Sequence, residues 1–207
     1  MILFVTATGT GVGKTWLSCA LARELAGHAR VVAIKPVETG GGDDGELLAA
    51  ATGQREPLRA LLRFRDPLTP ALAAEREGAA MDFDALVADV ARLAKDFDHA
   101  IVEGAGGVLS PLTYEADATD LARRLDAKVL LVAPDALGTL SATLAAMRCL
   151  PPSAIALIEP SVRDASTGTN ATVLRRRLGD VCPRIFEIAR GDTTNVGAIA
   201  RVLASIA

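Results

Sequence analysis

Short apolar runs alternate with amphipathic stretches along most of the chain. Six runs rich in branched apolar residues are predicted strands: Ile2–Thr6, Val31–Lys35, His99–Glu103, Lys128–Ala133, Ala154–Ile158 and Arg184–Ile188. Seven stretches have helical spacing: Trp16–Leu25, Glu46–Ala51, Phe83–Ala94, Asp120–Leu125, Leu140–Leu150, Ala171–Leu178 and Val196–Ile206. Runs such as Val129–Val132 are apolar on both faces, which is typical of a parallel sheet covered by helices. The pattern predicts an α/β fold with one doubly wound, mostly parallel sheet and helices on both faces.

Composition and loop placement indicate one folding unit. Half of the 207 residues are apolar and 3% are aromatic, which is enough for one hydrophobic core near the upper size limit. The sequence has no internal repeat and no low-complexity linker. We expect Gly40–Gly45 and Asp66–Ala80 to be loops rather than domain boundaries. Residues 1–207 are therefore predicted to form a single domain.

The charge pattern argues against nucleic-acid and membrane partners. The chain has 22 basic and 25 acidic residues, and its basic residues form no block typical of a polyanion-binding surface. Arg175–Arg177 lies within a helical pattern and is interpreted as a solvated face. No apolar stretch reaches membrane-spanning length, and no basic segment precedes the first apolar run, so we expect neither a span nor a signal peptide. Three widely separated cysteines fit free thiols in a reducing compartment, and we expect a cytoplasmic protein.

A glycine-rich segment follows the first predicted strand and precedes the first predicted helix. Its sequence is Thr8-Gly9-Thr10-Gly11-Val12-Gly13-Lys14-Thr15. Glycines let backbone N–H groups approach phosphates, the helix N-terminus favours negative charge, and a lysine and a hydroxyl here suit β/γ-phosphate oxygens and Mg²⁺. The strict phosphate-loop pattern has glycine at the position of Thr8, but Gly9 and Gly11 supply the flexibility. The segment is predicted to bind a nucleoside triphosphate.

Polar residues follow the next two predicted strands as well. Lys35 ends the second strand, and Glu103 ends the third and precedes the small residues Gly104-Ala105-Gly106-Gly107. The carboxyl ends of parallel strands meet at one edge of the sheet, where ligands of α/β proteins collect. A lysine there can stabilise developing negative charge, and an acid there is placed like the Mg²⁺ partner of a phosphate-loop enzyme. Backbone groups of the small residues are candidates for substrate binding.

An acidic pair lies in a second glycine-rich loop. Asp43 and Asp44 follow Gly40, Gly41 and Gly42, and either carboxylate could reach a metal if the loop folds over the crevice.

Three segments together resemble the dethiobiotin synthetase family. They are Ala7–Thr15, the run Lys35-Pro36-Val37-Glu38-Thr39-Gly40, and the run Val102-Glu103-Gly104-Ala105-Gly106-Gly107. Gly138-Thr139-Leu140 and Pro67–Glu75 resemble two further family segments in the same order. The resemblance implies ATP-dependent addition of carbon dioxide across the two amines of 7,8-diaminononanoate, which closes the ureido ring of dethiobiotin. An amine first captures carbon dioxide as a carbamate, the γ-phosphate activates it, and the second amine displaces phosphate.

The resemblance also implies roles for individual residues. Lys14, Lys35 and Thr10 would act on the phosphoryl and carbamate oxygens, and Thr15, Asp44 and Glu103 would hold Mg²⁺. Nucleotide contacts would come from Gly9, Thr10, Gly11, Val12, Gly13, Lys14, Thr15 and Glu187. Substrate contacts would come from Thr39, Gly104, Ala105, Gly106 and Gly107, and from Gly138, Thr139, Leu140 and Ser141. In the family the last of these groups belongs to the partner of a homodimer, so the resemblance implies a homodimer with the substrate site at its interface.

Some positions depart from the family pattern. Ala7 replaces a usual glycine, Gly11 replaces a glutamate of some members, and Ser141 replaces a common asparagine. Glu159-Pro160-Ser161 replaces an asparagine-containing segment that reads adenine, and Phe186–Ala189 only partly resembles the second base-contacting loop. The base preference is therefore open.

A nucleotide-switch ATPase of the partitioning type is the alternative function. Such proteins usually have a second lysine near the loop start, where this chain has Gly9, and a basic face or a membrane-binding terminal helix. A cobyrinate-type amidase synthetase would need a glutaminase domain, for which 207 residues leave no room.

Overall fold

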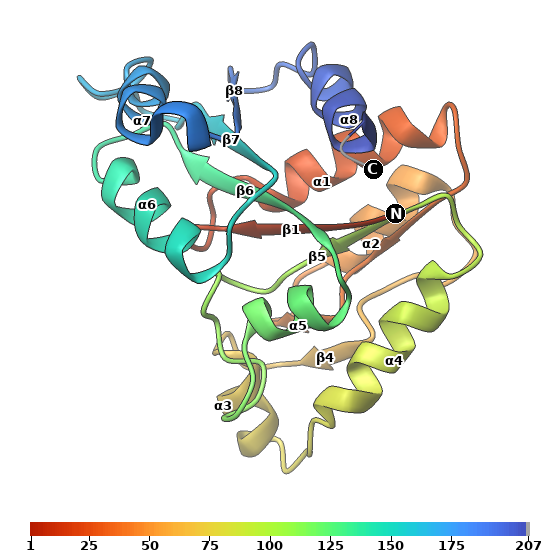
Figure 1. Ribbon diagram of the computed structural model, residues 1–207. Coiled ribbons are helices and arrows are strands. Elements are labelled where there is room, and N and C mark those ends of the chain that lie inside the picture. Colours follow the sequence, from red (N-terminus) through yellow and green to blue (C-terminus); the bar gives the residue numbers. More distant parts are fainter. Residues whose placement is uncertain (206–207) are drawn as a thin grey trace.

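A computed structural model describes residues 1–205 of the chain (Figure 1). Six parallel strands form the main sheet in the order β2-β5-β1-β6-β7-β8. Their bounds are β1 Ile2–Ala7, β2 Val31–Ile34, β5 His99–Glu103, β6 Lys128–Pro134, β7 Ala154–Ile158 and β8 Arg184–Ile188. All six predicted strands are confirmed, and the sheet is parallel throughout its described pairings.

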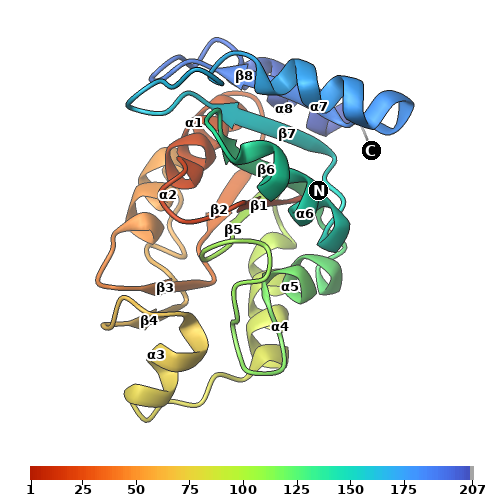
Figure 2. The same ribbon diagram turned by 90° about the vertical axis from the view of Figure 1, so that its left-hand side faces the viewer.

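Helices cover both faces of this sheet (Figures 1 and 2). Their bounds are α1 Lys14–Ala26, α2 Asp44–Thr52, α3 Pro70–Arg76, α4 Phe83–Ala94, α5 Ala118–Arg124, α6 Thr139–Cys149, α7 Asn170–Leu178 and α8 Val196–Ser205, with a 3₁₀ turn at Gly179–Val181. Helices α1, α2 and α8 pack on one face, and α4, α5, α6 and α7 pack on the other. The doubly wound α/β prediction is therefore confirmed. Ile206, the last residue of the predicted terminal helix, lies outside the described residues.

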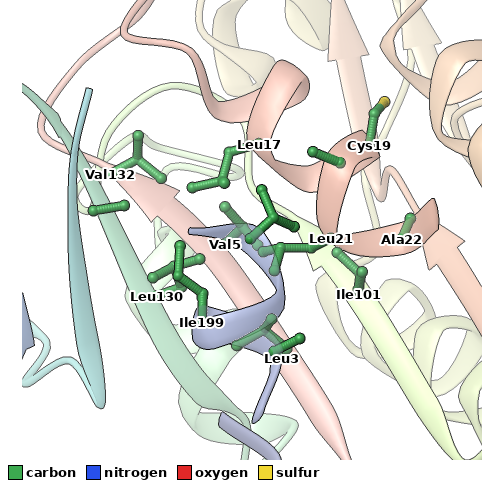
Figure 3. Close-up of a cluster of buried hydrophobic side chains, with 14 of the residues drawn as sticks. Leu3, Val5, Leu17, Cys19, Leu21, Ala22, Ile101, Leu130, Val132 and Ile199 are labelled. Atoms are coloured by element: carbon green, nitrogen blue, oxygen red, sulfur yellow. The ribbon is translucent and has the colours of Figure 1, made fainter. Parts of the chain in front are cut away.

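The alternation of side chains along β1 explains the two cores. Leu3 and Val5 point toward α1 and α8, while Phe4 points toward α4 and α5. Figure 3 shows Leu17 and Leu21 of α1 meeting Val5 and the neighbouring strands. Full burial of each such leucine contributes about 1.5–3 kcal/mol by the hydrophobic effect. These contacts fix the start of α1, and with it the glycine loop, against the carboxyl end of β1.

Two segments predicted to be loops contain helical residues in the structure. Asp66–Ala80 contains helix α3, which begins at Pro70 because proline suits the first helical position. Helix α2 begins at Asp44, inside the predicted loop Gly40–Gly45. The prediction of loops throughout both segments is therefore wrong.

A small second sheet was not predicted. Strands β3 Val37–Thr39 and β4 Leu62–Phe64 pair in parallel and lie apart from the main sheet (Figure 2). Each has three residues, which is too short to show a period in the sequence.

Within the described part of the chain, no helix is long and apolar enough to cross a membrane. Cys19, Cys149 and Cys182 are free thiols, as predicted.

Candidate active site

The glycine loop leads directly from β1 into α1. Gly11 and Gly13 have φ angles of 72° and 97°, in the left-handed region that favours glycine. A Cβ at Gly13 would lie 2.8 Å from the end of the Ile158 side chain, so a substitution there would also displace that side chain. No acidic residue occupies the first turn of α1, which leaves the helix N-terminus free to favour an anion.

Lys14 begins α1 and is almost fully buried. Its Nζ donates to the backbone oxygen of Gly9 at 3.3 Å, across the loop. Burial lowers the pKa of Lys14, and repulsion from Lys35 lowers it further. The ammonium is thus held in a place that disfavours its charge unless an anion is present.

Four side chains from different elements converge beside Lys14. Lys35 Nζ lies 2.7 Å from Asp44 Oδ2 and 2.6 Å from Glu103 Oε1. The Thr15 hydroxyl lies 2.9 Å from Asp44 Oδ1 and 3.0 Å from Glu103 Oε1. Three loops that are far apart in the sequence therefore meet at one point, as the strand-end argument predicted.

The two carboxylates control the charge of Lys35. Burial alone would lower the pKa of Lys35, but attraction to Glu103 and Asp44 outweighs it and raises the pKa. Burial alone would raise the pKa of Asp44, but the Lys35 charge and hydrogen bonds from Lys35 and Thr15 lower it. Lys35 is consequently a fixed cation at the floor of the site.

The donor set fits Mg²⁺. Thr15, Asp44 and Glu103 offer hard oxygens, with both carboxylates within hydrogen-bond distance of the Thr15 hydroxyl, and Glu103 Oε2 is buried without a hydrogen-bond partner. Among residues 1–205 no cluster of three or more His, Cys, Asp or Glu side chains forms a complete metal cage. A partial set of this kind suits Mg²⁺, which usually keeps waters and takes substrate phosphate oxygens as its other ligands. Asp43 is exposed and lies outside the cluster, so the geometry favours Asp44 over Asp43.

A cavity of about 850 Å³ lies over this cluster. Of the sequence-predicted residues, it is lined by Thr10, Gly11, Gly13, Lys14, Thr15, Lys35, Thr39, Asp44, Ala105 and Gly106. Gly104 and Gly107 are absent from the lining, and a Cβ would come 3.0 Å from Phe4 at Gly104 and 3.3 Å from the Ala7 oxygen at Gly107. A cavity of this volume has room for the β- and γ-phosphates of a nucleotide together with a small substrate.

A second cavity of about 480 Å³ adjoins the first. It is lined by Val12, Pro134, Ile158, Glu159, Pro160, Ser161, Arg190 and Gly191, and it shares Gly11, Gly13 and Trp16 with the larger cavity. A nucleotide with its phosphates on the glycine loop would reach this cavity with its sugar and base. Trp16 is the one shared residue with a side chain.

Two groups of predicted contacts lie away from these cavities. The Glu187 carboxylate on β8 pairs with Arg175 of α7 at 3.1 Å and is absent from both cavity linings. Gly138, Thr139, Leu140 and Ser141 start α6 and are absent from them too. The neighbouring Leu137 has 86% of its surface exposed. Within this chain, the start of α6 therefore does not reach the cavity beside Lys35.

Several residues that line the two cavities were not predicted from the sequence. Trp16, Glu38 and Ser110 line the larger cavity, and Arg190 and Gly191 line the smaller one. Glu38 stands inside the Lys35–Gly40 motif and Trp16 directly follows Thr15, but no local pattern shows that either side chain faces the cavity. Ser110, Arg190 and Gly191 are brought to the site by tertiary packing.

The fold and this site define a nucleotide-binding protein of the phosphate-loop class, in which a parallel sheet presents a glycine loop, a helix N-terminus and a lysine to phosphates. Residues 2–159 match a protein family described as an AAA domain. The ATP-dependent dethiobiotin synthetase BioD of Caulobacter sp. (strain K31) is 40% identical over 221 residues, covering 99% of this chain and 95% of the relative. The same enzyme of Anaeromyxobacter sp. (strain Fw109-5) is 43% identical over 155 residues, covering 72% and 70%. The chain belongs to the ATP-dependent dethiobiotin synthetase family.

Solved structures support the fold assignment. HypB from Helicobacter pylori, in complex with nickel, matches with a TM-score of 0.58 and 16% identity, covering 99% of this chain and 85% of that chain. A plasmid partition protein from Borrelia burgdorferi matches with a TM-score of 0.52 and 11% identity, covering 99% and 96%. At such identities the likeness shows the fold alone, so it gives the alternative switch-ATPase function no separate support.

Proposed function

We propose that the larger cavity is the site at which this chain carries out the reaction of its family. That reaction converts 7,8-diaminononanoate, carbon dioxide and ATP to dethiobiotin, ADP and phosphate, in biotin biosynthesis. The observation that carries the proposal is the convergence of Lys14, Thr15, Lys35 and Asp44 on one cavity beside the glycine loop, with the buried Glu103 paired to Lys35 and Thr15.

The two lysines and Thr10 would divide the charge stabilisation. The carbamate oxygen attacks the γ-phosphorus of ATP and ADP leaves, which gives a carbamic–phosphoric anhydride. The second amine then attacks the carbamate carbon, phosphate leaves with that oxygen, and the amine proton passes to solvent. Lys14 and Thr10 line the phosphate end of the cavity, and Lys35 lies at its floor. Positioning and fixed positive charge supply most of the catalysis in such phosphoryl transfers.

Mg²⁺ would be held by Thr15, Asp44 and Glu103. When bound, it neutralises charge on the β- and γ-phosphate oxygens. Thr39, Ala105 and Gly106 line the same cavity and would place the diamine, with Gly104 and Gly107 shaping the backbone behind them.

The chain offers no sign of nucleic-acid or membrane binding in its charge pattern, and a cytoplasmic location suits a biosynthetic enzyme of this kind.

The substrate carboxylate would be bound by a second copy of the chain. Gly138, Thr139, Leu140 and Ser141 present a helix N-terminus that no acidic residue occupies, and they lie outside this chain's own cavity. A homodimer that brings the α6 start of one subunit to the cavity of the other would complete the site.

Phosphate release with a product assay tests the proposed function. We expect release from ATP and Mg²⁺ with bicarbonate to depend on 7,8-diaminononanoate and to match dethiobiotin formed. CTP and GTP in parallel reactions measure the base preference that Glu159–Ser161 leaves open. Release that ignores the diamine, or that responds to DNA or lipid instead, would favour the switch ATPase.

Mixing two inactive variants tests the shared site. K14M removes the phosphate-binding charge, and S141D places a negative charge where the substrate carboxylate would bind. Random pairing makes half of the dimers mixed, each with one intact site, so about a quarter of the parental activity should return. Each variant alone serves as the control. A mixture no more active than the variants, after subunit exchange is verified by mass spectrometry, argues against a site shared between subunits.

Trp16 offers a direct signal of nucleotide binding because it is the single tryptophan of the chain. We expect ADP to change its fluorescence, since the sugar and base must pass the side chain that both cavities share. Tripolyphosphate should bind with a smaller change, because it reaches only the glycine loop. W16F is the control for background emission. Equal signals from ADP and tripolyphosphate would exclude a Trp16 contact with the sugar or base.

A further inference from the structure

The loop that carries Asp44 lacks the local features that usually fix a loop. Gly40, Gly41 and Gly42 are exposed, and Gly40 and Gly41 have φ angles of 81° and 68°. Glycine-rich segments lose much conformational entropy on ordering, so such a loop needs anchors elsewhere. Asp43, at the N-cap of α2, makes no side-chain capping hydrogen bond. The position of Asp44 must therefore be set by residues outside the loop.

Glu38 of β3 supplies the missing cap. Its Oε1 accepts a hydrogen bond from the backbone N–H of Asp44 at 2.6 Å, although the two residues lie on separate elements. Only 4% of Glu38 is exposed, and it lines the larger cavity. A Cβ at Gly42 would lie 2.9 Å from the same Oε1, so the loop wraps closely around the carboxylate.

Arg63 of β4 holds the same loop from its other side. It is the register partner of Glu38 in the small sheet, and its Nε lies 3.7 Å from Glu38 Oε2. One guanidinium nitrogen donates to the Gly42 oxygen at 2.9 Å, and another pairs with Glu46 in the first turn of α2 at 2.9 Å. One arginine thus joins the loop, the helix and the capping carboxylate.

The small sheet gives this pair a rigid base. Glu38 and Arg63 are adjacent across paired strands, and Gly45 of α2 packs so closely on the segment before β4 that a Cβ there would lie 2.2 Å from the Ala60 nitrogen. The start of α2 is therefore packed in one position against β3 and β4. In that position Asp44, the first residue of α2, faces Thr15 and Lys35.

We propose that Glu38 and Arg63 are positioning residues that set Asp44 as a ligand for the Mg²⁺ bound with the nucleotide. We call this pair the Glu38–Arg63 clamp. It acts through the backbone of the loop and of α2. The inference rests on the proposed role of Asp44, and its test separates the two.

Calorimetric titration of the full chain with ADP, with and without Mg²⁺, tests the clamp. E38A removes the cap, and we expect it to reduce the Mg²⁺-dependent gain in ADP affinity by about tenfold, as the loss of a strong helix cap would. E38Q keeps an oxygen that can accept the Asp44 N–H and should retain most of the gain. Metal-free ADP affinity should be unchanged in both, because the glycine loop is untouched.

Arg63 variants give a second route and a matched control. R63A should lose part of the Mg²⁺-dependent gain, and it decides the matter if E38A does not fold. R65A removes an arginine two residues further on, which pairs with Glu77 instead of the loop, and it should behave as the parent. The clamp is overturned if E38A keeps the full Mg²⁺-dependent gain in ADP affinity. It is also overturned if E38A loses as much ADP affinity without Mg²⁺ as with it. A parent without any Mg²⁺-dependent gain would instead overturn the proposed metal role of Asp44.

Discussion

Replacing Lys35 by methionine is expected to lower the diamine-dependent rate of ATP hydrolysis by about 10²–10³-fold, the usual effect of removing one preorganised charge-stabilising group. Lys35 is the cation at the floor of the cavity, and two carboxylates hold it in one place. Methionine keeps much of the length of the side chain and removes the charge. Coupled phosphate release and dethiobiotin formation under saturating ATP measure the effect on kcat.

The K35M variant should also be less stable, because it leaves Glu103 buried without its cation. Breaking such a pair costs about 3–5 kcal/mol, whereas replacing both partners is often nearly neutral. The double variant K35M/E103Q should therefore regain thermal stability without regaining activity. Activity within threefold of the parent in folded K35M would contradict a catalytic role for this lysine.

The main sheet was predictable because its strands carry a strong signal. Parallel strands covered on both faces are nearly continuous apolar runs, as β7 and residues 129–133 of β6 show. β3 and β4 have three residues each, and their pairing depends on contacts between distant segments. The first turn of α1 was missed because Lys14 and Thr15 belong to the loop motif as well as to the helix.

The convergence of Lys14, Lys35 and Glu103 was predictable for a topological reason, whereas Asp44, which starts α2 after β3, was singled out only through the family resemblance. The carboxyl ends of parallel strands meet at one edge, so residues that end or follow neighbouring strands gather there. The role of each remains a prediction until it is measured, as does the division of the chain into one domain.

Residues placed by side-chain direction or by packing could not be predicted in the same way. Glu187 lies on the edge strand β8, and the sequence does not show that its carboxylate turns toward Arg175 of α7. Trp16 and Glu38 reach the cavity because α1 and β3 pack beside it. Local patterns contain no information on such packing.

The K14M variant should lose ATP binding while the nucleotide-free protein becomes more stable. Burial and Lys35 lower the pKa of Lys14, so the folded state binds that proton less tightly than the unfolded state. Lys14 therefore destabilises the folded protein at every pH below its ordinary pKa of 10.5, which includes neutral pH. Methionine removes that penalty and keeps the apolar stem of the side chain.

Lys14 and Lys35 are expected to have opposite effects on the stability of the nucleotide-free protein. Lys35 has two carboxylate partners and stabilises the fold, whereas Lys14 donates a hydrogen bond to the Gly9 backbone oxygen and is placed to bind an anion. Thermal unfolding without nucleotide should rank K14M above the parent and K35M below it. Calorimetry should show ATP affinity reduced by at least about tenfold in K14M. A destabilised K14M with parental ATP affinity would mean that Lys14 is a structural residue, and the phosphate site would then lie elsewhere.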